Sequence, residues 1–322
     1  MTSTALEPVI DPDRPLIDAH HHLSAGPGES YVLDDLIEDL SSGHRITSTV
    51  YCENKAFFRA DGPEELRAAG EVEFANGAAA IGASGRFGPT RFCAAIVGSV
   101  DLRRGAAVEP ALEALIAAGN GRLRGVRTVA GNDPEVKQYV PAGLLADERL
   151  REGFARLGSY GLTWETWLYH TQLGELRDLV ETRPEQPVAI DHAAGLIGIG
   201  SYADRRDLEV ARWRRGLQAL AEFPNVHVKL GGFYMREFAL LGSDLSSSAL
   251  ARAAAPIVDT CLEIFGPARC MFESNFPLTR DFLSYRVLWN SFKRLSDGLS
   301  ESEKDLVLHD TAAAFYHIEE EA

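Results

Sequence analysis

Eight short segments rich in β-branched and other apolar residues recur along this 322-residue chain, and a segment with helical spacing follows each of them. Strands that alternate with helices favour a parallel sheet covered by helices. We expect strands at 16–19, 46–53, 91–100, 123–130, 162–169, 187–192, 225–233 and 270–277. Eight such units predict the α/β class: a single (β/α)8 barrel over 1–322, with a polar arm at 1–14 and an extra C-terminal helix.

The helical segments close the units at regular intervals. They are expected at 32–40, 63–74, 108–118, 147–157, 173–181, 204–222, 248–265, 281–295 and 300–315. An open, doubly wound sheet is the alternative architecture, but the glycine-rich turn that such sheets carry after their first strand is missing. The barrel is therefore the better prediction.

Charge and cysteine usage narrow the classes of partner. The chain has 47 acidic and 32 basic residues, a formal net charge of −15, and no basic cluster, which argues against nucleic acid or an anionic membrane as a partner. Its four cysteines form no zinc-binding spacing, and neither a secretory leader nor a membrane-spanning stretch is recognisable. We expect a cytoplasmic protein with reduced thiols that acts on a small molecule.

The first expected strand runs directly into three consecutive histidines. Because alternate side chains share one face of a strand, His20 and His22 should point the same way, with Asp18 one layer below and His21 on the opposite face. Two imidazoles at this spacing can hold a metal ion or polarise a carbonyl. A polar strand end without such a role is the simpler alternative.

Polar residues gather where the other expected strands end. In a (β/α)8 barrel these C-terminal ends and the loops after them form the active site, so a bias of this kind predicts a site there. The residues concerned are Glu53, Arg127, His170, Asp191, His192, Lys229, Glu273, Ser274 and Asn275.

Each of these side chains has a structural alternative. Glu53 could accept a proton during catalysis, or it could form an ion pair within a loop. Arg127 offers a planar fork for a substrate carboxylate, or an ion pair with Glu53 or Glu165. Lys229 and Glu273 could bind substrate or pair with each other inside the barrel.

Six sequence blocks in order carry a family resemblance. The chain resembles the amidohydrolase superfamily from about residue 15 to 318, and within it the amidohydrolase-2 branch of predicted metal-dependent hydrolases and sugar or dicarboxylate lactonases. The blocks are IDAHHHL at 17–23, GVR at 125–127, WLYHTQL at 167–173, DHAAG at 191–195, VKLGG at 228–232 and ESNFP at 273–277.

The resemblance implies a barrel enzyme that hydrolyses a C–O or C–N bond or, in some members, removes a carboxyl group. By motif position, His20, His22 and His192 match the histidines of the family's active site. The resemblance leaves open whether they hold one divalent ion (zinc or manganese) or act without a metal. Arg127 matches an arginine that helps lactone-hydrolysing relatives bind the substrate's carboxylate or carbonyl.

Asn275 departs from the superfamily pattern, which places an aspartate there. An amide is a weak zinc ligand and cannot accept a proton near neutral pH. The candidates for the general base are therefore Glu53, His170 and Glu273. Asn275 would orient the substrate or a water molecule. The fourth strand also lacks the lysine that is carbamylated in two-metal members, which argues against a dinuclear centre.

These observations favour a hydrolase, most of all a lactonase that opens a carboxylated or sugar-derived lactone. A metal-dependent decarboxylase of an aromatic or enoic acid is the first alternative, and a non-catalytic barrel that binds a small ligand is the second. The terminal helices at 281–315 could supply the interface of a homo-oligomer.

Overall fold

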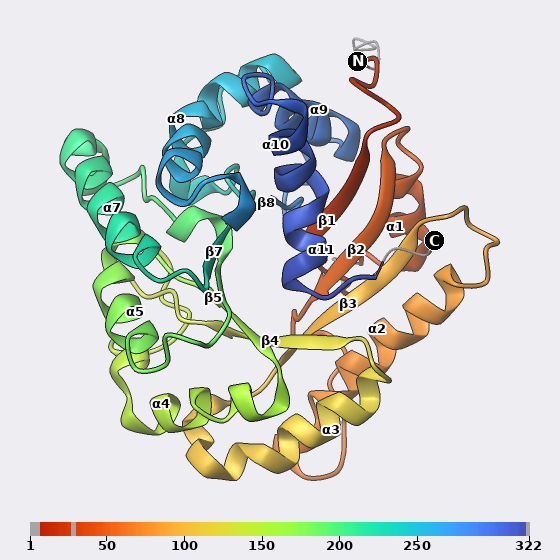
Figure 1. Cartoon of the computed structure of the whole chain (residues 1–322), viewed down its shortest axis with the longest axis vertical. Helices are drawn as coiled ribbons and strands as arrows, with labels where there is room; N and C mark the ends of the chain where they lie inside the picture. The colour runs from red at the N-terminus through yellow and green to blue at the C-terminus, as the bar shows by residue number, and fades with distance from the viewer. Residues whose placement is uncertain (1–6, 27–29, 320–322) are drawn as a thin grey trace.

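A computed structural model describes residues 7–26 and 30–319, and it contains the predicted barrel. Eight parallel strands follow one another in chain order around the sheet (Figure 1). The last strand meets the first through a bridge between Phe276 and His21, which brings the two edges together. The strands are β1 (Pro15–His21), β2 (Arg45–Cys52), β3 (Arg91–Ser99), β4 (Leu123–Val129), β5 (Thr163–Trp167), β6 (Val188–Ile190), β7 (Val226–Leu230) and β8 (Cys270–Phe272).

Helices lie between the strands and surround the barrel (Figure 1). They are α1 (Leu33–Leu40), α2 (Ala69–Gly82), α3 (Glu109–Gly119), α4 (Glu148–Phe154), α5 (Leu173–Val180), α6 (Ser201–Asp204), α7 (Arg206–Ala221), α8 (Ser247–Phe265), α9 (Tyr285–Leu295), α10 (Glu301–Asp305) and α11 (Thr311–Phe315). The last two are joined by one π-helical turn over Leu306–Asp310. The predicted extra C-terminal helix is therefore present, in three parts.

Two helical predictions were wrong in their bounds. The helix expected at 63–74 is a single 3₁₀ turn at Glu64–Leu66 followed by α2, which extends to Gly82 because its second half is rich in alanine, the best helix former. The helix expected at 204–222 is divided into α6 and α7 at Arg205, whose backbone leaves the helical region.

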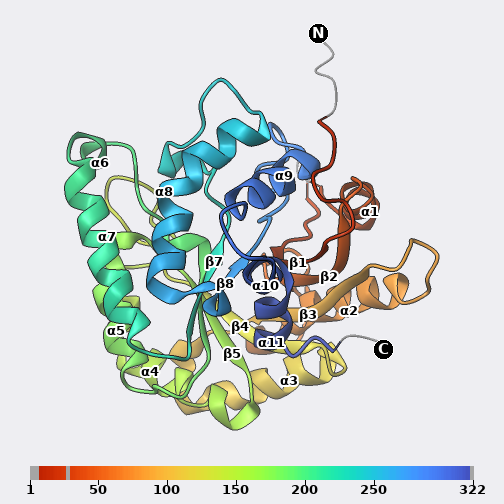
Figure 2. The ribbon, with the colours of Figure 1, turned by 45° about the horizontal axis from the view of Figure 1, so that its top comes forward.

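The C-terminal helix closes one end of the barrel. Inward-facing apolar side chains of β1, β2, β3, β6 and β8 form a core cluster with residues of α11 and the segment after it. Phe315, Tyr316 and Ile318 supply the helical side of this cluster, and Figures 1 and 2 show α10 and α11 crossing in front of the strands. Because this end is filled, a ligand must approach the barrel interior from the opposite end, where the strands terminate.

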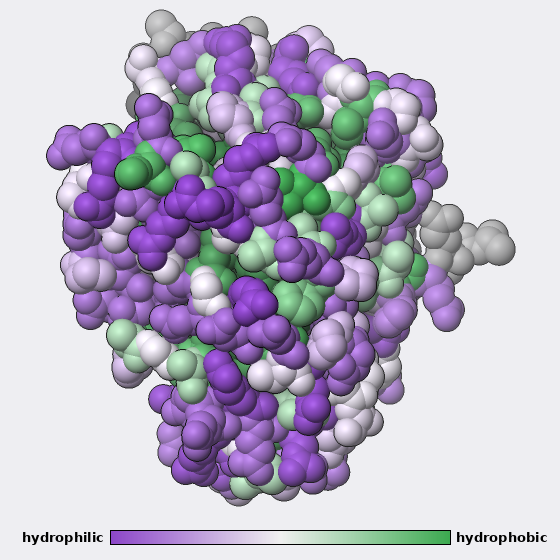
Figure 3. Space-filling model, turned by 60° about the vertical axis from the view of Figure 1, so that its left-hand side comes forward, coloured by the Kyte–Doolittle hydropathy of each residue, from purple (hydrophilic) through white to green (hydrophobic). Residues whose placement is uncertain are grey.

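A second, larger apolar cluster fills the space between the strands and the surrounding helices. Outside it the surface is polar: on the face shown in Figure 3 hydrophilic side chains predominate and hydrophobic ones lie in hollows between them. All four cysteines are buried, and none forms a disulfide bond. Among the described residues, no helix has the length and apolar content needed to cross a membrane.

The N-terminal segment packs along the last helices instead of extending away from the barrel. Lys293 of α9 donates hydrogen bonds to the carbonyl oxygens of Ile10 and Asp11 at 2.8 and 2.6 Å. Arg14 forms an ion pair with Asp305 at 2.6 Å. Residues 1–6 of the predicted polar arm lie outside the described part of the chain.

Candidate active site

A bulge in β1 decides which way the histidine strand faces. The register between β1 and β2 shifts between Asp18 and His21, so strict alternation fails there. Asp18 consequently faces the helices, where it accepts hydrogen bonds from the hydroxyl groups of Ser274 (2.6 Å) and Tyr285 of α9 (3.0 Å). The prediction that Asp18 lies one layer below His20 on the same face was therefore wrong.

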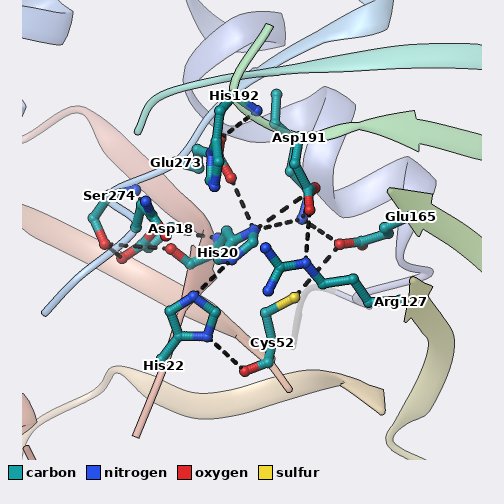
Figure 4. Close-up of polar contacts among 12 residues, drawn as sticks. Asp18, His20, His22, Cys52, Arg127, Glu165, Asp191, His192, Glu273 and Ser274 are labelled. Atoms are coloured by element: carbon teal, nitrogen blue, oxygen red, sulfur yellow. Dashed lines mark hydrogen bonds and ion pairs between the residues drawn. The ribbon is translucent and has the colours of Figure 1, made fainter. Parts of the chain in front are cut away.

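His20 and His22 do point toward each other, as Figure 4 shows, at the end of the barrel where the strands terminate, and both are buried. Their Nε2 atoms lie 3.1 Å apart. The Nδ1 atom of His22 donates to the carbonyl oxygen of Cys52 at 2.9 Å, which leaves the lone pair of this ring on Nε2. Burial, reinforced by the positive charge of Arg127, lowers the pKa of His22 to about 3, so the ring is neutral at neutral pH.

His21 lies behind this pair, as the sequence predicted. Its Nε2 atom is 2.9 Å from the hydroxyl oxygen of Thr49, and its ring packs edge-on against Tyr51. His21 therefore stabilises the contact between β1 and β2 and has no part in the site.

His192 and Glu273 complete the histidine cluster. Residues 192–194 adopt left-handed backbone conformations directly after β6, which turns the chain sharply and carries the His192 ring toward His20. Its Nδ1 atom lies 2.5 Å from Glu273 Oε1, and Glu273 Oε2 lies 2.9 Å from His20 Nδ1. One carboxylate thus orients two of the three imidazoles.

The glycines after β7 allow this approach. Gly232 has φ of +61°, and a Cβ atom there would lie 2.5 Å from the His192 ring. A side chain at this position would displace the ring. A Cβ atom at Gly231 would lie 2.0 Å from the carbonyl oxygen of Glu273, so both glycines of the VKLGG block leave room that the site requires.

A layer of buried charges adjoins His20, and Figure 4 shows Arg127, Glu165 and Asp191 beside its ring. Lys229 of β7 is fully buried; its Nζ atom lies 2.6 Å from Glu165 Oε2, 3.6 Å from Asp191 Oδ1 and 3.2 Å from His20 Nδ1. Asp191 also accepts a hydrogen bond from Arg127 Nε at 2.8 Å. Burial would raise the pKa of Asp191, but Lys229 and Arg127 outweigh it and hold this pKa below its usual value.

These contacts revise the predicted pairing of charges. The ion pair considered as one alternative for Lys229 and Glu273 is not formed, because Glu165 is the direct partner of Lys229 and Glu273 contacts the histidines. The ion pair considered between Arg127 and Glu53 is present but long, at 3.7 Å, and Asp191 is the stronger partner of Arg127.

Glu53 lies at the border between this layer and a cavity. The cavity has a volume of about 510 Å³ and lies over the ends of β2, β3 and β4, where Glu53 and Arg127 form part of its wall. Burial raises the pKa of Glu53, and the Arg127 guanidinium opposes that rise. Among the described residues, Glu53 Oε2 has no hydrogen-bond partner.

Asn275 is near the histidines and His170 is not. The backbone N–H of Asn275 donates to the carbonyl oxygen of His20 at 2.9 Å, and its buried side-chain oxygen has no hydrogen-bond partner among the described residues. His170 instead contacts Glu209 of α7 through Nε2 at 3.0 Å and the backbone N–H of Ile197 through Nδ1. Both ring nitrogens of His170 are therefore already used outside the cluster.

Three residues of the site received no chemical role from the sequence. Asp191 was named only as a residue at a strand end, Glu165 only as a partner for Arg127, and Cys52 only as a thiol outside any zinc motif. The signal for Glu165 was a charged residue in the middle of an otherwise uncharged buried strand, TWETW. Cys52 Sγ lies 3.6 Å from Glu165 Oε2, at the floor of the site.

The residues present fit a divalent metal ion. Two facing imidazole nitrogens at 3.1 Å require a proton or a cation between them, since their lone pairs otherwise repel. On the Nδ1 side of the His20 ring, two buried carboxylate oxygens, Asp191 Oδ1 at 3.8 Å and Glu273 Oε2 at 2.9 Å, have no partner with hydrogen-bond geometry among the described residues. Within the described part of the chain, His20 forms potential ligand groups with Asp191 and Glu273 and with Cys52 and Glu165. Nitrogen and oxygen ligands of this kind suit zinc or manganese.

Comparison with known proteins identifies the family. The model of the family described as amidohydrolase (Amidohydro_2) matches residues 17–318. An L-fucono-1,5-lactonase from Burkholderia multivorans is 30% identical over 234 residues, 71% of this chain and 73% of that protein. The uncharacterized protein y4mH of Sinorhizobium fredii is 30% identical over 187 residues; the match spans 58% of this chain and only about half, 55%, of that protein.

Solved structures share the fold. An amidohydrolase from Burkholderia multivorans, solved once with bound HEPES and once with bound zinc, matches with TM-scores of 0.73 and 0.71 at 23% and 24% identity, covering 94% of this chain and 99% of that one. A 2,6-dihydroxybenzoate decarboxylase from Rhizobium matches with a TM-score of 0.56 at 12% identity, covering 95% of this chain and 98% of that one. At these identities the similarity extends to the fold alone.

Proposed function

The chain belongs to the amidohydrolase family, and we propose that it is a lactonase that opens a carboxylated or sugar-derived lactone. Family membership supports a hydrolase in general. The L-fucono-1,5-lactonase, 30% identical over 71% of this chain, supports the lactone as the substrate class.

One observation carries the proposal: three imidazoles and one carboxylate converge at the end of the barrel where the strands terminate. His20, His22 and His192 lie within one cluster, and Glu273 contacts two of them. Lactone hydrolysis needs a polarised carbonyl and a proton acceptor for the attacking water. This cluster offers both within a few ångströms.

Glu273 is our candidate for the general base. His170 is bonded to Glu209 away from the cluster, and Glu53 lies beside Arg127 at the cavity wall. Glu273 Oε2 lies 2.9 Å from His20 Nδ1, but this contact lacks hydrogen-bond geometry, so the oxygen has a free lone pair beside the imidazoles. In this scheme Glu273 accepts a proton from water, and Asn275, an amide with a free oxygen, orients that water or the substrate.

The charged layer beside His20 would hold the cluster in place. Lys229 keeps His20 oriented, and Arg127 fixes Asp191 through its Nε atom. His20, His22 and His192, with Asp191 or Glu273, would hold one divalent ion, zinc or manganese. When bound, such an ion supplies Lewis-acid polarisation of the carbonyl.

The decisive experiment combines a lactone panel with a variant of the first histidine. Purified protein should release acid from L-fucono-1,5-lactone or a related sugar lactone, and His20→Ala should lower kcat/KM by about 100-fold or more. His317→Asn, a change at an exposed histidine next to the C-terminal helix, is the matched control and should leave kcat/KM unchanged. Retained activity in folded His20→Ala would refute the proposed site.

A second measurement tests the base. Glu273→Gln should remove the acidic limb of the pH profile of kcat, whereas Glu53→Gln should retain it. The reverse result would transfer the role of base to Glu53. Release of carbon dioxide from 2,6-dihydroxybenzoate without hydrolysis of any lactone would identify a decarboxylase. Ligand-induced thermal stabilisation without any turnover would identify a binding protein.

A further inference from the structure

The cavity beside the candidate active site is rich in cationic side chains, although the whole protein is acidic. Its wall includes six cationic and four anionic residues, whereas the chain has a formal net charge of −15. A locally positive cavity in an acidic protein favours an anionic ligand. The charged residues of the wall are Lys55, Arg59, Arg67, Arg103, Arg104 and Arg127, with Glu53, Glu64, Glu65 and Asp101.

Most of these cations already have partners. Arg103 forms two hydrogen bonds to Asp101, Arg59 pairs with Glu73, and Arg127 bonds Asp191. Because its charge is already balanced, Arg127 is poorly suited to be the main group that binds a substrate carboxylate.

Two cations of the wall, Lys55 and Arg104, make no side-chain hydrogen bond among the described residues. Arg67 also lacks an ion pair there, but its Nε atom donates to the carbonyl oxygen of Gly62 at 3.2 Å. Lys55 has no ion-pair partner among the residues that the structure describes. Arg104 has only a long contact of 3.6 Å to Glu65, and its side chain is 39% exposed, so an anion in the cavity can reach its guanidinium group.

The loop that carries Lys55 is held in a strained conformation. Lys55 has φ of +58°, a left-handed conformation that costs about 1 kcal/mol or more for a residue with a side chain. The N–H groups of its two neighbours, Asn54 and Ala56, donate to one carboxylate oxygen of Glu71 at 2.9 and 3.0 Å. Glu71 is buried in α2 and pins the loop on both sides of the lysine. Lys55 is therefore positioned at the cavity wall by a dedicated contact.

We propose that Lys55 and Arg104 bind a carboxylate group of the substrate in this cavity, while the reacting carbonyl lies at the histidine cluster. This proposal rests on the lactonase function and selects, within it, lactones that carry a carboxylate. A single negative charge fits better than a phosphate dianion, because four carboxylates share the wall with the cations. Glu53 and Arg127, which line the cavity and border the cluster, connect the two parts of the site.

Binding of open-chain acids tests the anion site without relying on turnover. D-glucarate and citrate are titrated calorimetrically into wild-type protein and into Lys55→Gln and Arg104→Gln, with D-gluconate, which has one carboxylate fewer than glucarate, as the reference ligand. The affinity for at least one of the two multivalent acids should fall about ten-fold or more in each variant. Arg149→Gln is the control, because this exposed residue lines the neighbouring hollow and is not part of the cavity wall.

Turnover separates this proposal from the lactonase proposal. In both variants kcat/KM for D-glucaro-1,4-lactone should fall through KM, while kcat/KM for neutral D-glucono-1,5-lactone stays unchanged. Acid binding that depends on Lys55 and Arg104 without turnover of any lactone would retain the anion site and overturn the lactonase. Acid binding that is absent from the wild type, or unaffected by both substitutions, would overturn the anion site even in an active lactonase.

Discussion

Replacing Lys229 by methionine should be among the most destabilising single changes in the barrel. The ammonium group is fully buried and lies 2.6 Å from Glu165 Oε2 and 3.6 Å from Asp191 Oδ1. At an effective dielectric constant of about 20, two unit charges 2.6 Å apart attract by about 6 kcal/mol, and much of this offsets the desolvation of both groups. Lys229→Met leaves two buried carboxylates without that cation, and removing one partner of a buried pair costs about 3–5 kcal/mol.

A double-mutant cycle shows whether Glu165 is the partner that matters. Glu165→Gln alone should cost less than Lys229→Met, because Asp191 still faces the ammonium group. The loss of unfolding free energy in the double variant should be smaller, by about 2 kcal/mol, than the sum of the losses in the two single variants. The measurement is the free energy of unfolding in urea, followed by circular dichroism.

The same cycle with Glu273→Gln is the matched comparison. Glu273 bonds His20 and His192, so its coupling energy with Lys229 should be smaller than that of Glu165. Additive losses for Lys229 and Glu165, within about 0.5 kcal/mol, would refute the assignment of their ion pair. A larger coupling with Glu273 would restore the pairing that the sequence alone suggested.

Three further outcomes are expected. Burial, reinforced by the charge of Lys293, lowers the pKa of His44 to about 4 from a usual value near 6.5. As the pH falls, His44 is therefore protonated in the unfolded chain before it is protonated in the folded protein. The free energy of unfolding should decrease between pH 6.5 and 4, by up to about 3 kcal/mol. Melting temperatures between pH 7 and 5 should decline less steeply in His44→Gln, and an unchanged slope would contradict the assignment. Gly232→Ala should lower kcat at least ten-fold in a folded protein by displacing the His192 ring; full activity would disprove that close approach. Elemental analysis should find about one zinc or manganese ion per chain, which dialysis against a chelator removes together with activity; activity that persists in metal-free protein would show that the imidazoles act without an ion.

The sequence pattern was sufficient to predict the architecture, because the architecture follows from the local preferences of each strand and helix. Alternation of apolar strands with helices fixes the order and approximate position of every unit, and parallel strands bring their ends to one face. The cluster of His20, His22 and His192 follows from this, since each residue lies at the exit of a strand. The bounds of single elements were less predictable: the left-handed turn at His192 ends β6 at Ile190, although the residue pattern continues to 192.

The choice of partners among buried charges was decided by the tertiary structure. Whether Lys229 meets Glu165 or Glu273 depends on the register of β5, β6, β7 and β8, which is not encoded in the residue types of a single strand. The bulge in β1 is not encoded there either. That bulge turns Asp18 outward and His20 inward, against the period of two. Likewise, His170 lies at a strand exit in the sequence, yet Glu209 of α7 binds it away from the site. Local sequence placed the polar groups near one end of the barrel, and only the packing of distant elements determined which of them meet.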